Sequence, residues 1–274
     1  MRNILSERRD HEEESDKLER RYEENALFKE KNKEEFRVLE EVFDRLTLQA
    51  MLKLYNRGTI DELYGAIKAG KEARVYWATQ QDGTELAIKI YYTHTADFRK
   101  GMMKYIEGDP RFKRIRRNPR SIVYTWTQKE FNNLQLASEA EVNSPRPVDF
   151  YRNILVMTFI GEDGVPAPLL REIDPEEPQD FYDKTVEEMK LLYQDAGLAH
   201  GDLSEYNIMV WEEKPVIFDL SQAMLTIHPM AEMLVKRDIQ NINNYFGRLG
   251  VETRDHEELE EWITGGTQDI YEDT

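Results

Sequence analysis

The amino-acid sequence predicts an α+β protein with two lobes. An antiparallel sheet with one packed helix is followed by a mostly helical lobe and preceded by extra N-terminal helices. Between residues 63 and 92 the apolar residues alternate with a period of two around the turn signal Asp82-Gly83, which predicts short antiparallel strands. From residue 178 onward they recur mostly at helical spacing. With 274 residues, 40% of them hydrophobic, the chain can bury a real core and suits one two-lobed unit, with one domain plus appendages as the alternative.

The composition excludes several classes of protein. The chain has 37 basic and 54 acidic residues, and its net charge of -17 opposes wholesale wrapping of nucleic acid. It has no cysteine, which excludes disulfides and thiolate metal sites, and its five histidines are too scattered to indicate a zinc site. No apolar run reaches the length of a membrane span, and the first residues lead into charge instead of a signal-peptide core. We therefore expect a cytoplasmic protein without membrane contact, whose oligomeric state the sequence leaves open.

Residues 1–46 are expected to form a charged helical extension. Apolar residues are sparse up to about residue 30 and recur at helical spacing from about residue 35, so a solvated helix is expected to become a packed one there. A short helix is predicted from Thr47 to Tyr55, with Thr47 as its N-cap and Gly58 as its stop.

Strands are predicted at 63–67, 74–78 and 85–92, with a tight loop at Gly70. This loop could cover phosphates, although an ordinary hairpin is the alternative. Lys89 interrupts the apolar third strand, where a side chain that faces a core or a cleft needs an anionic partner. Phosphates and a helix glutamate would supply one, and an edge-strand lysine is the alternative.

Residues 94–120 are polar and irregular, which predicts a flexible loop. They contain nine basic and three acidic residues, a net charge of +6, and are the one basic segment of an acidic chain. Such a loop could contact the phosphates of ATP or RNA, and a solvated insertion is the alternative. The pattern from Ser121 to Ala140 predicts a helix. Glu130 stands there among apolar residues and is the expected partner of Lys89, although a surface glutamate is the alternative.

A buried strand is predicted from Asn153 to Ile160, after a short one at 148–151. The chain leaves it through a glycine-rich turn, where the Thr158 carbonyl and the Ile160 amide could hold an adenine ring. Helices are predicted at 178–197, 229–249 and 254–262, and a disordered tail at 264–274.

The stretch from His200 to Asn207, followed by Asp219 behind a short apolar run, indicates phosphoryl transfer from ATP. This reaction needs Mg²⁺ and the acceptor to be held in line, with a carboxylate near the acceptor hydroxyl. Asp202 is predicted to accept the proton of that hydroxyl. Asn207 and Asp219 are predicted to hold the metal, because Mg²⁺ prefers oxygen ligands. Any one of these residues alone would more often be a turn or capping residue, but their joint spacing favours the catalytic interpretation.

Seven segments of the chain share one pattern, and they are Ala69–Tyr76, Ala87–Ile90, Asn118–Arg120, Pro166–Leu170, Tyr193–Ala196, His200–Asn207 and Phe218–Gln222. Together they resemble the RIO family of atypical serine protein kinases, over residues 45 to 250. The resemblance is to the first branch of the family in its archaeal size, because residues 1–58 lack the pattern of the winged-helix domain that leads the second branch.

The resemblance implies a trimmed two-lobed protein-kinase-like fold that binds ATP and Mg²⁺, with Mn²⁺ as a possible substitute. The N-lobe would span residues 47–160, including the N-terminal helix typical of the family, and the C-lobe would span 161–263 with the catalytic and metal loops. The residues expected to contact the nucleotide are Gly70, Lys71, Val75, Lys89, Glu130, Met157, Thr158 and Ile160.

The resemblance also implies a role in maturation of the small ribosomal subunit, with a pre-small-subunit ribosomal particle as partner and a local RNA contact through 94–120. Members of the family act as serine kinases in vitro, and as ATPase switches. Asp219 then also resembles the aspartate of the family that is transiently phosphorylated.

The chain departs from ordinary protein kinases in three places. Ser204 stands two residues after the catalytic aspartate, where many kinases carry lysine; Asp219 is followed by Leu-Ser instead of Phe-Gly; and no Ala-Pro-Glu segment follows. An activation loop and a peptide-docking platform are therefore not expected, which weighs against efficient phosphorylation of proteins.

Two alternative functions remain open on the sequence. Small-molecule phosphotransferases of the aminoglycoside-kinase type use a similar His-Gly-Asp-Leu loop, although the Gly70-Lys71-Glu72 loop and the basic segment argue against them. The other alternative is a binding module for ribosome assembly, in which ATP occupancy sets the affinity for a particle and turnover resets it.

Overall fold

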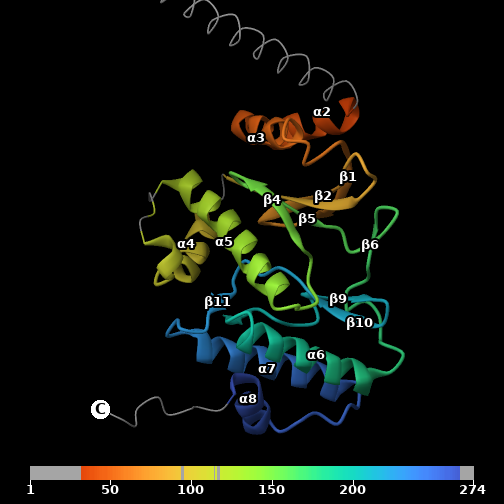
Figure 1. The fold of residues 1–274 in the computed structure, drawn as a ribbon, viewed down its shortest axis with the longest axis vertical. Coiled ribbons are helices and arrows are strands. Elements are labelled where there is room, and N and C mark those ends of the chain that lie inside the picture. Colours follow the sequence, from red (N-terminus) through yellow and green to blue (C-terminus); the bar gives the residue numbers. More distant parts are fainter. Residues whose placement is uncertain (1–31, 94–95, 114, 116–117, 266–274) are drawn as a thin grey trace, which may run out of the picture.

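A computed structural model describes residues 32–93, 96–113, 115 and 118–265. It has the predicted two-lobed α+β architecture, with a sheet and two covering helices above and a group of helices below (Figure 1). Most of the predicted N-terminal extension and of the predicted tail lie outside the described residues. None of the helices within the described ranges combines the length and the hydropathy that a membrane span requires.

The N-lobe is built on a five-stranded antiparallel sheet with the order β1-β2-β3-β5-β4. In the central strand β3 the side chains of Leu86, Ile88 and Ile90 face the core under the N-terminal helices. The alternate positions, which include Lys89, therefore face the other lobe, because successive side chains of a strand point to opposite faces. The strands are β1 (Glu62–Ala69), β2 (Ala73–Thr79), β3 (Glu85–Tyr91), β4 (Pro147–Tyr151) and β5 (Ile154–Thr158).

Helices α2 (Lys33–Val42) and α3 (Arg45–Tyr55) cover the outer face of this sheet (Figure 1). The N-cap of α3 is Asp44, whose carboxylate accepts a hydrogen bond from the Thr47 backbone N–H at 2.9 Å. The prediction of Thr47 as N-cap was therefore wrong by one turn, since aspartate is an equally good cap and lies at the true start. The boundary predicted between residues 46 and 47 falls inside this helix.

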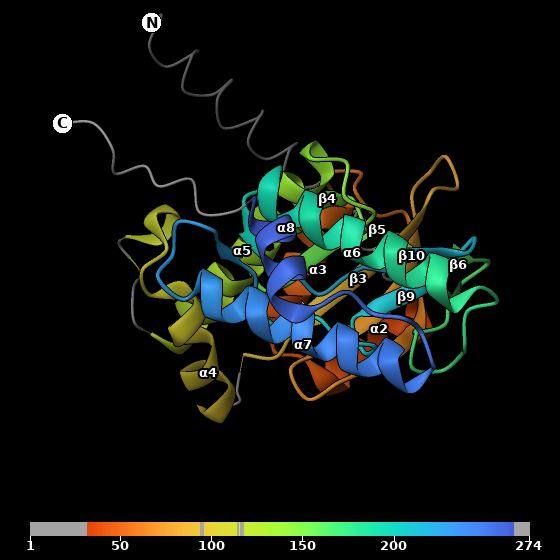
Figure 2. The same ribbon diagram turned by 90° about the horizontal axis from the view of Figure 1, so that it is seen from below.

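A flexible loop was predicted for residues 94–120. The structure instead has helix α4 (Ala96–Ile106) and the 3₁₀ turn η1 (Pro110–Phe112) within this range. Met102, Tyr105 and Ile106 of α4 are buried against α5. Their spacing follows one face of a helix, but the many charged residues around them obscured it in the sequence. Figures 1 and 2 both place α4 on the side of the molecule opposite β6.

Helix α5 (Pro119–Glu139) connects the two lobes. The Asn118 side chain caps it by accepting from the Ser121 backbone N–H at 2.9 Å, and Pro119 occupies the first turn, where its missing N–H costs nothing. Its inner face is unusual, because Lys129, Glu130 and Asn133 are buried there beside apolar residues. These polar groups require partners. Strand β3 provides them for Glu130, and the C-lobe loop after Asp219 provides them for Lys129 and Asn133.

The C-lobe is mostly helical, as predicted. Its three helices pack on one another, with α8 against both α6 and α7 (Figure 2). Short strand pairs β8–β11 and β9–β10 hold the loops that run from His200 to Asn207 and from Phe218 to Gln222. The remaining elements are β6 (Gly161–Glu162), β7 (Val165–Pro166), α6 (Pro178–Gln194), β8 (Leu198–Ala199), β9 (Ile208–Trp211), β10 (Lys214–Ile217), β11 (Met224–Leu225), α7 (Ala231–Arg248) and α8 (His256–Thr264).

Candidate active site

A cavity of about 450 Å³ lies between the sheet and the C-lobe loops. Asp219 lines it, whereas Asp202 and Asn207 lie on the loop beside it and are not among its lining residues. All eight residues predicted to contact the nucleotide line the cavity, and they are Gly70, Lys71, Val75, Lys89, Glu130, Met157, Thr158 and Ile160. Their individual roles stay predictions.

One part of the cavity is an apolar slot. Val75, Ala87 and Met157 line it from the sheet, and Leu169 and Met209 from the C-lobe. Such a slot can accept a planar ring, which would lose contact with water on both faces.

The chain crosses from one lobe to the other beside this slot. Thr158 is paired with Leu86 in the sheet, so its backbone is fixed. The Ile160 carbonyl accepts from the Ala167 N–H at 3.0 Å. No backbone group of the described residues accepts from the Ile160 N–H, which leaves this donor for an adenine acceptor.

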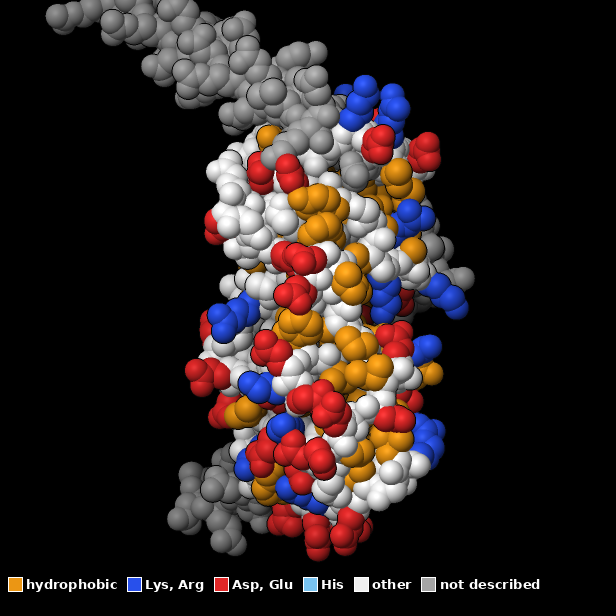
Figure 3. All heavy atoms as spheres, turned by 90° about the vertical axis from the view of Figure 1, so that its right-hand side faces the viewer, with side chains coloured by type: hydrophobic (Ala, Val, Ile, Leu, Met, Phe, Trp, Pro, Cys, Tyr) orange, Lys and Arg blue, Asp and Glu red, His pale blue; other side chains and the backbone are white. Residues whose placement is uncertain are grey.

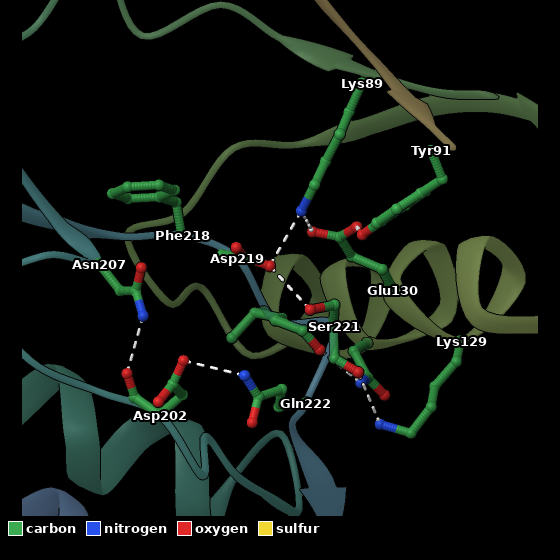
Figure 4. Close-up of polar contacts among 12 residues, drawn as sticks. Lys89, Tyr91, Lys129, Glu130, Asp202, Asn207, Phe218, Asp219, Ser221 and Gln222 are labelled. Carbon is green, nitrogen blue, oxygen red and sulfur yellow. Dashed lines mark hydrogen bonds and ion pairs between the residues drawn. The ribbon is translucent and has the colours of Figure 1, made fainter. Parts of the chain in front are cut away.

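The polar end of the cavity contains an ion cluster in which Lys89 and Glu130 are buried and Asp219 is partly exposed (Figure 4). Lys89 Nζ lies 2.7 Å from Glu130 Oε1 and 2.9 Å from Asp219 Oδ1, which confirms the predicted Lys89–Glu130 pair. The Tyr91 hydroxyl donates to the other oxygen of Glu130. The structure thus brings a strand lysine, a helix glutamate and the aspartate of a distant loop into direct contact.

The charges of this cluster stabilise one another. Burial favours the neutral form of Lys89, but the carboxylates of Asp219 and Glu130 outweigh it and raise the pKa of the ammonium well above its usual value. Burial likewise tends to raise the pKa of Asp219, and the Lys89 ammonium lowers it to about 2. For Glu130 burial prevails over Lys89, and the pKa of this carboxyl is raised. Lys89 and Asp219 are therefore a charged pair over the whole physiological pH range.

Asp219 adopts a backbone conformation that non-glycine residues rarely take, with φ 62°. Its Oδ1 accepts hydrogen bonds from both Lys89 Nζ and the Ser221 hydroxyl, the latter at 2.8 Å. Its second carboxylate oxygen has no hydrogen-bond donor among the described residues and is available to a ligand.

Asp202 lies on an exposed turn at the edge of the site. Its Oδ2 accepts from Gln222 Nε2 at 2.9 Å, and its backbone carbonyl accepts from Asn207 Nδ2 at 2.7 Å (Figure 4). Burial of part of the side chain raises its pKa, and the negative charge of Asp219 adds to this effect. A carboxylate with a raised pKa is a better proton acceptor than an ordinary aspartate.

Two buried residues hold the turn that carries Asp202. Asp238 of α7 accepts from the backbone N–H groups of Gly201 at 2.7 Å and Leu203 at 2.9 Å. The His200 ring has Nε2 3.1 Å from the Phe218 carbonyl, which fits an Nε2–H donor, and burial lowers its pKa to about 4. Gly201 has φ 79°, a conformation that favours glycine.

The sequence interpretation missed four residues of the site, namely Asp238, Gln222, Tyr91 and Glu72. Asp238 had a signal, because it is an acidic residue next to Ile239 on the apolar face of the predicted helix 229–249. Glu72 lines the cavity from the Gly70 loop; partial burial raises its pKa to about 7, assisted by the negative charge of Asp219. Gln222 and Tyr91 depend on contacts across the chain that spacing does not reveal.

The oxygen atoms in the site suit a Mg²⁺ ion. Asn207 donates through Nδ2, and no described residue donates to its Oδ1 or to the second carboxylate oxygen of Asp219. Within the described part of the chain, no group of three or more histidine, cysteine or acidic side chains could hold a metal by itself. One amide and one carboxylate, completed by phosphate oxygens and water, is an arrangement that Mg²⁺ accepts.

Comparison with protein-family models matches the RIO domain to residues 74–259. The chain belongs to the RIO family. Its similarity to the RIO-type serine/threonine-protein kinase Rio1 of Haloferax volcanii is 42% identity, covering 86% of this chain and 80% of the relative. The Rio1 of Methanocaldococcus jannaschii is 40% identical, covering 93% of this chain and 87% of the relative. The human serine/threonine-protein kinase RIO1 is 38% identical over 89% of this chain, which spans 44% of that protein.

Solved structures with a similar fold include the Rio2 kinase from Chaetomium thermophilum in an ADP/Mg²⁺-phosphoaspartate complex. Superposition of this chain on that structure gives a TM-score of 0.63 at 22% sequence identity and covers 80% of this chain and 67% of the Rio2 kinase chain. This likeness shows the fold. The family, the two-lobed kinase-like fold and the protein-kinase class predicted from the sequence are thereby confirmed.

Proposed function

We propose that this RIO-family chain binds ATP and Mg²⁺ in the cavity between its lobes and acts as a serine/threonine protein kinase with ATPase activity. One observation carries the proposal: Lys89 is paired with both Glu130 and Asp219 at the polar end of the cavity. That cluster places a cation where phosphates would lie. The names of the relatives, and the ADP and Mg²⁺ of the Rio2 kinase complex, support the choice of ligand.

The residues of the chain divide the work as follows. Lys89 contacts phosphate oxygens and is fixed in place by Glu130. The oxygens of Asn207 and Asp219 hold Mg²⁺, which when bound neutralises charge on the phosphates. Asp202 accepts the proton of the attacking hydroxyl, of a serine or of water, through a carboxylate whose pKa is raised.

Asp219 has a second role in the proposal, as a transient phosphoryl acceptor. Lys89 and Ser221 both donate to Oδ1, so the other carboxylate oxygen, when it does not hold Mg²⁺, can attack the γ-phosphorus with ADP as the leaving group. Water would then hydrolyse the acyl phosphate and restore the carboxylate. The phosphoaspartate of the Rio2 kinase complex supports this role.

The C-lobe favours ATP turnover over phosphorylation of long peptides. After Asp219 the chain forms only the short strand β11 before α7 begins at Ala231. This leaves little chain for a platform on which a protein substrate could lie. We therefore propose that ATP turnover acts largely as a switch, which keeps the nucleotide-gated binding module as the second candidate function.

The partner proposed for this switch is a pre-small-subunit ribosomal particle, contacted partly through RNA. Acidic side chains gather on the helical lobe of the face shown in Figure 3, which disfavours RNA there. The segment 94–120 remains the proposed contact. Arg111 is already paired with Asp109 and Asn133, so the other basic residues of the segment would have to make it.

The test is ATP turnover by the purified protein with Mg²⁺, alone and with small-subunit particles, beside the Asp219→Ala variant. Phosphate release that particles stimulate and the variant lacks would support the switch. Steady label on one ribosomal protein without stimulated release would make the kinase activity primary. Absence of any ATP binding would contradict both.

A further inference from the structure

The loop 220–223, which directly follows Asp219, is attached to helix α5. Asn133 Nδ2 donates to the carbonyl of Leu220 at 2.8 Å and to that of Ala223 at 3.0 Å. Asn133 is completely buried. Buried carbonyls and amides that are satisfied in this way fix the loop in one position, because breaking the contacts would leave polar groups unpaired.

Lys129, one helical turn before Asn133, makes equivalent contacts. Its Nζ donates to the carbonyl of Ser221 at 3.1 Å and to that of Ala223 (Figure 4). The side chain is completely buried and lies with its ammonium 5.7 Å from the centre of the Trp126 ring. We name Lys129 and Asn133 the α5 clamp. Three carbonyls of one short loop are thus bound by two side chains of one helix.

The α5 clamp is in turn connected to the chain ahead of α5. Asn133 Oδ1 accepts from Arg111 Nη2 at 2.9 Å, and the same nitrogen lies 2.7 Å from Asp109 Oδ2. Asp109 is buried and also accepts from the Arg111 backbone N–H at 3.0 Å. The turn 109–112 therefore reaches the loop after Asp219 through a continuous set of hydrogen bonds.

Asp219 needs such support. Its backbone has φ 62°, which costs free energy unless the surrounding structure holds it. Glu130, the neighbour of Lys129 on α5, reaches Asp219 from the other side through Lys89. Helix α5 thus fixes both the carboxylate of Asp219 and the main chain that follows it.

We propose that Asn133, Lys129 and Arg111 are positioning residues for the metal ligand Asp219, and that the turn 109–112 belongs to the metal-binding apparatus. This inference rests on the proposed function, because it assigns Asp219 to Mg²⁺. This turn of the basic segment is then connected to the metal site, so that its displacement weakens Mg²⁺ binding without touching the nucleotide slot.

The test measures the affinity for ADP first in EDTA and then at increasing Mg²⁺ concentrations. The half-effect Mg²⁺ concentration is the one at which half of the gain in ADP affinity is reached. Asn133→Asp keeps the acceptor for Arg111 but turns an oxygen toward the two carbonyls, so the half-effect Mg²⁺ concentration is expected to rise about tenfold. Arg111→Met removes the outer contact and is expected to raise it about threefold. Arg111→Lys should recover part of this loss. ADP affinity in EDTA should stay at the wild-type value in all three.

The matched control is Arg57→Met, which removes a similar arginine–aspartate pair, to Asp149 at 3.1 Å, on the N-lobe surface. It should leave the Mg²⁺ dependence unchanged. Arg111 is partly exposed whereas Asn133 is completely buried, so Arg111→Met decides the question even if Asn133→Asp does not fold. Folded variants with lower melting temperatures but wild-type Mg²⁺ dependence would show a merely structural role and overturn the proposal. If the wild-type protein itself bound ADP with the same affinity with and without Mg²⁺, the proposed function would be overturned, and this inference with it.

Discussion

The two halves of the active site differ in how their charges are held. On the N-lobe side, Lys89 and Glu130 are buried, and each has a charged or hydroxyl partner within hydrogen-bond distance. On the C-lobe side, Asp202 is exposed, and its turn is held through main-chain groups by buried Asp238. A buried charge without its partner is costly, whereas an exposed one is solvated by water. Changes to the buried Lys89–Glu130 pair should therefore affect stability, whereas changes to the exposed Asp202 side chain should affect the reaction rate alone.

The largest effect is expected at Asp202. Asp202→Asn keeps the shape of the side chain but removes the proton acceptor, so phosphoryl transfer should fall by about 10³-fold. The melting temperature and the affinity for Mg²⁺-ADP should stay near the wild-type values. The measurement is single-turnover transfer from labelled ATP beside calorimetric titration with ADP. An equal loss of ADP affinity would show that Asp202 belongs to the binding half of the site.

Removing Lys89 should destabilise the fold as well as the activity. Lys89→Met leaves Glu130 and Asp219 without their cation, which should lower the free energy of unfolding by about 3–5 kcal/mol. The double variant Lys89→Met/Glu130→Gln removes one of the stranded charges and should recover part of that loss. Urea unfolding of both variants measures this. A Lys89→Met variant as stable as the wild type would contradict the argument that Lys89 stabilises the two carboxylates.

The pH dependence of stability should report on His200. Its pKa is lowered by burial from 6.5 to about 4, so between these values the unfolded chain binds a proton that the folded chain does not. The contribution of this ring to stability should therefore fall by roughly 3 kcal/mol as the pH drops from 6.5 to 4. Urea unfolding without ligands at pH 7 and pH 4.5 measures this. Between the two pH values the free energy of unfolding of His200→Gln should drop less than that of the wild type. His256→Gln is the control, and an unchanged drop in the His200 variant would refute the assignment.

The smallest effect is expected at Gln222. Its amide donates to Asp202 Oδ2 at 2.9 Å and orients that carboxylate on an exposed turn. Gln222→Ala should lower kcat about fivefold, because a hydrogen bond to a charged group is lost at a site open to water. Gln240→Ala removes a similar amide contact, to Asn244 at 2.8 Å on the surface of α7, and should leave kcat unchanged. Equal kcat values for the two variants would argue against an orienting role for Gln222.

Comparison of the sequence predictions with the structure shows which signals are local. The strands around Lys89 and the helices of the C-lobe follow from period and turn chemistry. The eight residues expected to contact the nucleotide were predicted from them together with the family resemblance, and all eight line the cavity. Glu130 was found because one acidic residue stood on an apolar helix face. The same reasoning applied to Asp238 would have found the support of the Asp202 turn.

Other features depended on tertiary contacts. Helix α4 was predicted as a loop because its charged residues masked a short apolar face that only the packing against α5 makes evident. The α5 clamp could not be predicted, since a lysine and an asparagine that bind main-chain carbonyls have no characteristic spacing. The sequence therefore predicts the reacting groups better than the residues that hold them in position.

The central claim is that the cavity between the lobes is the nucleotide site. It is tested most directly by photolabelling with 8-azido-ATP and Mg²⁺, followed by mapping of the labelled peptides. The structure predicts label on residues of the apolar slot, such as Val75, Met157 and Met209, and its loss when excess ATP is present. Label confined to peptides outside the cavity, or label in the slot that ATP does not displace, would contradict the account.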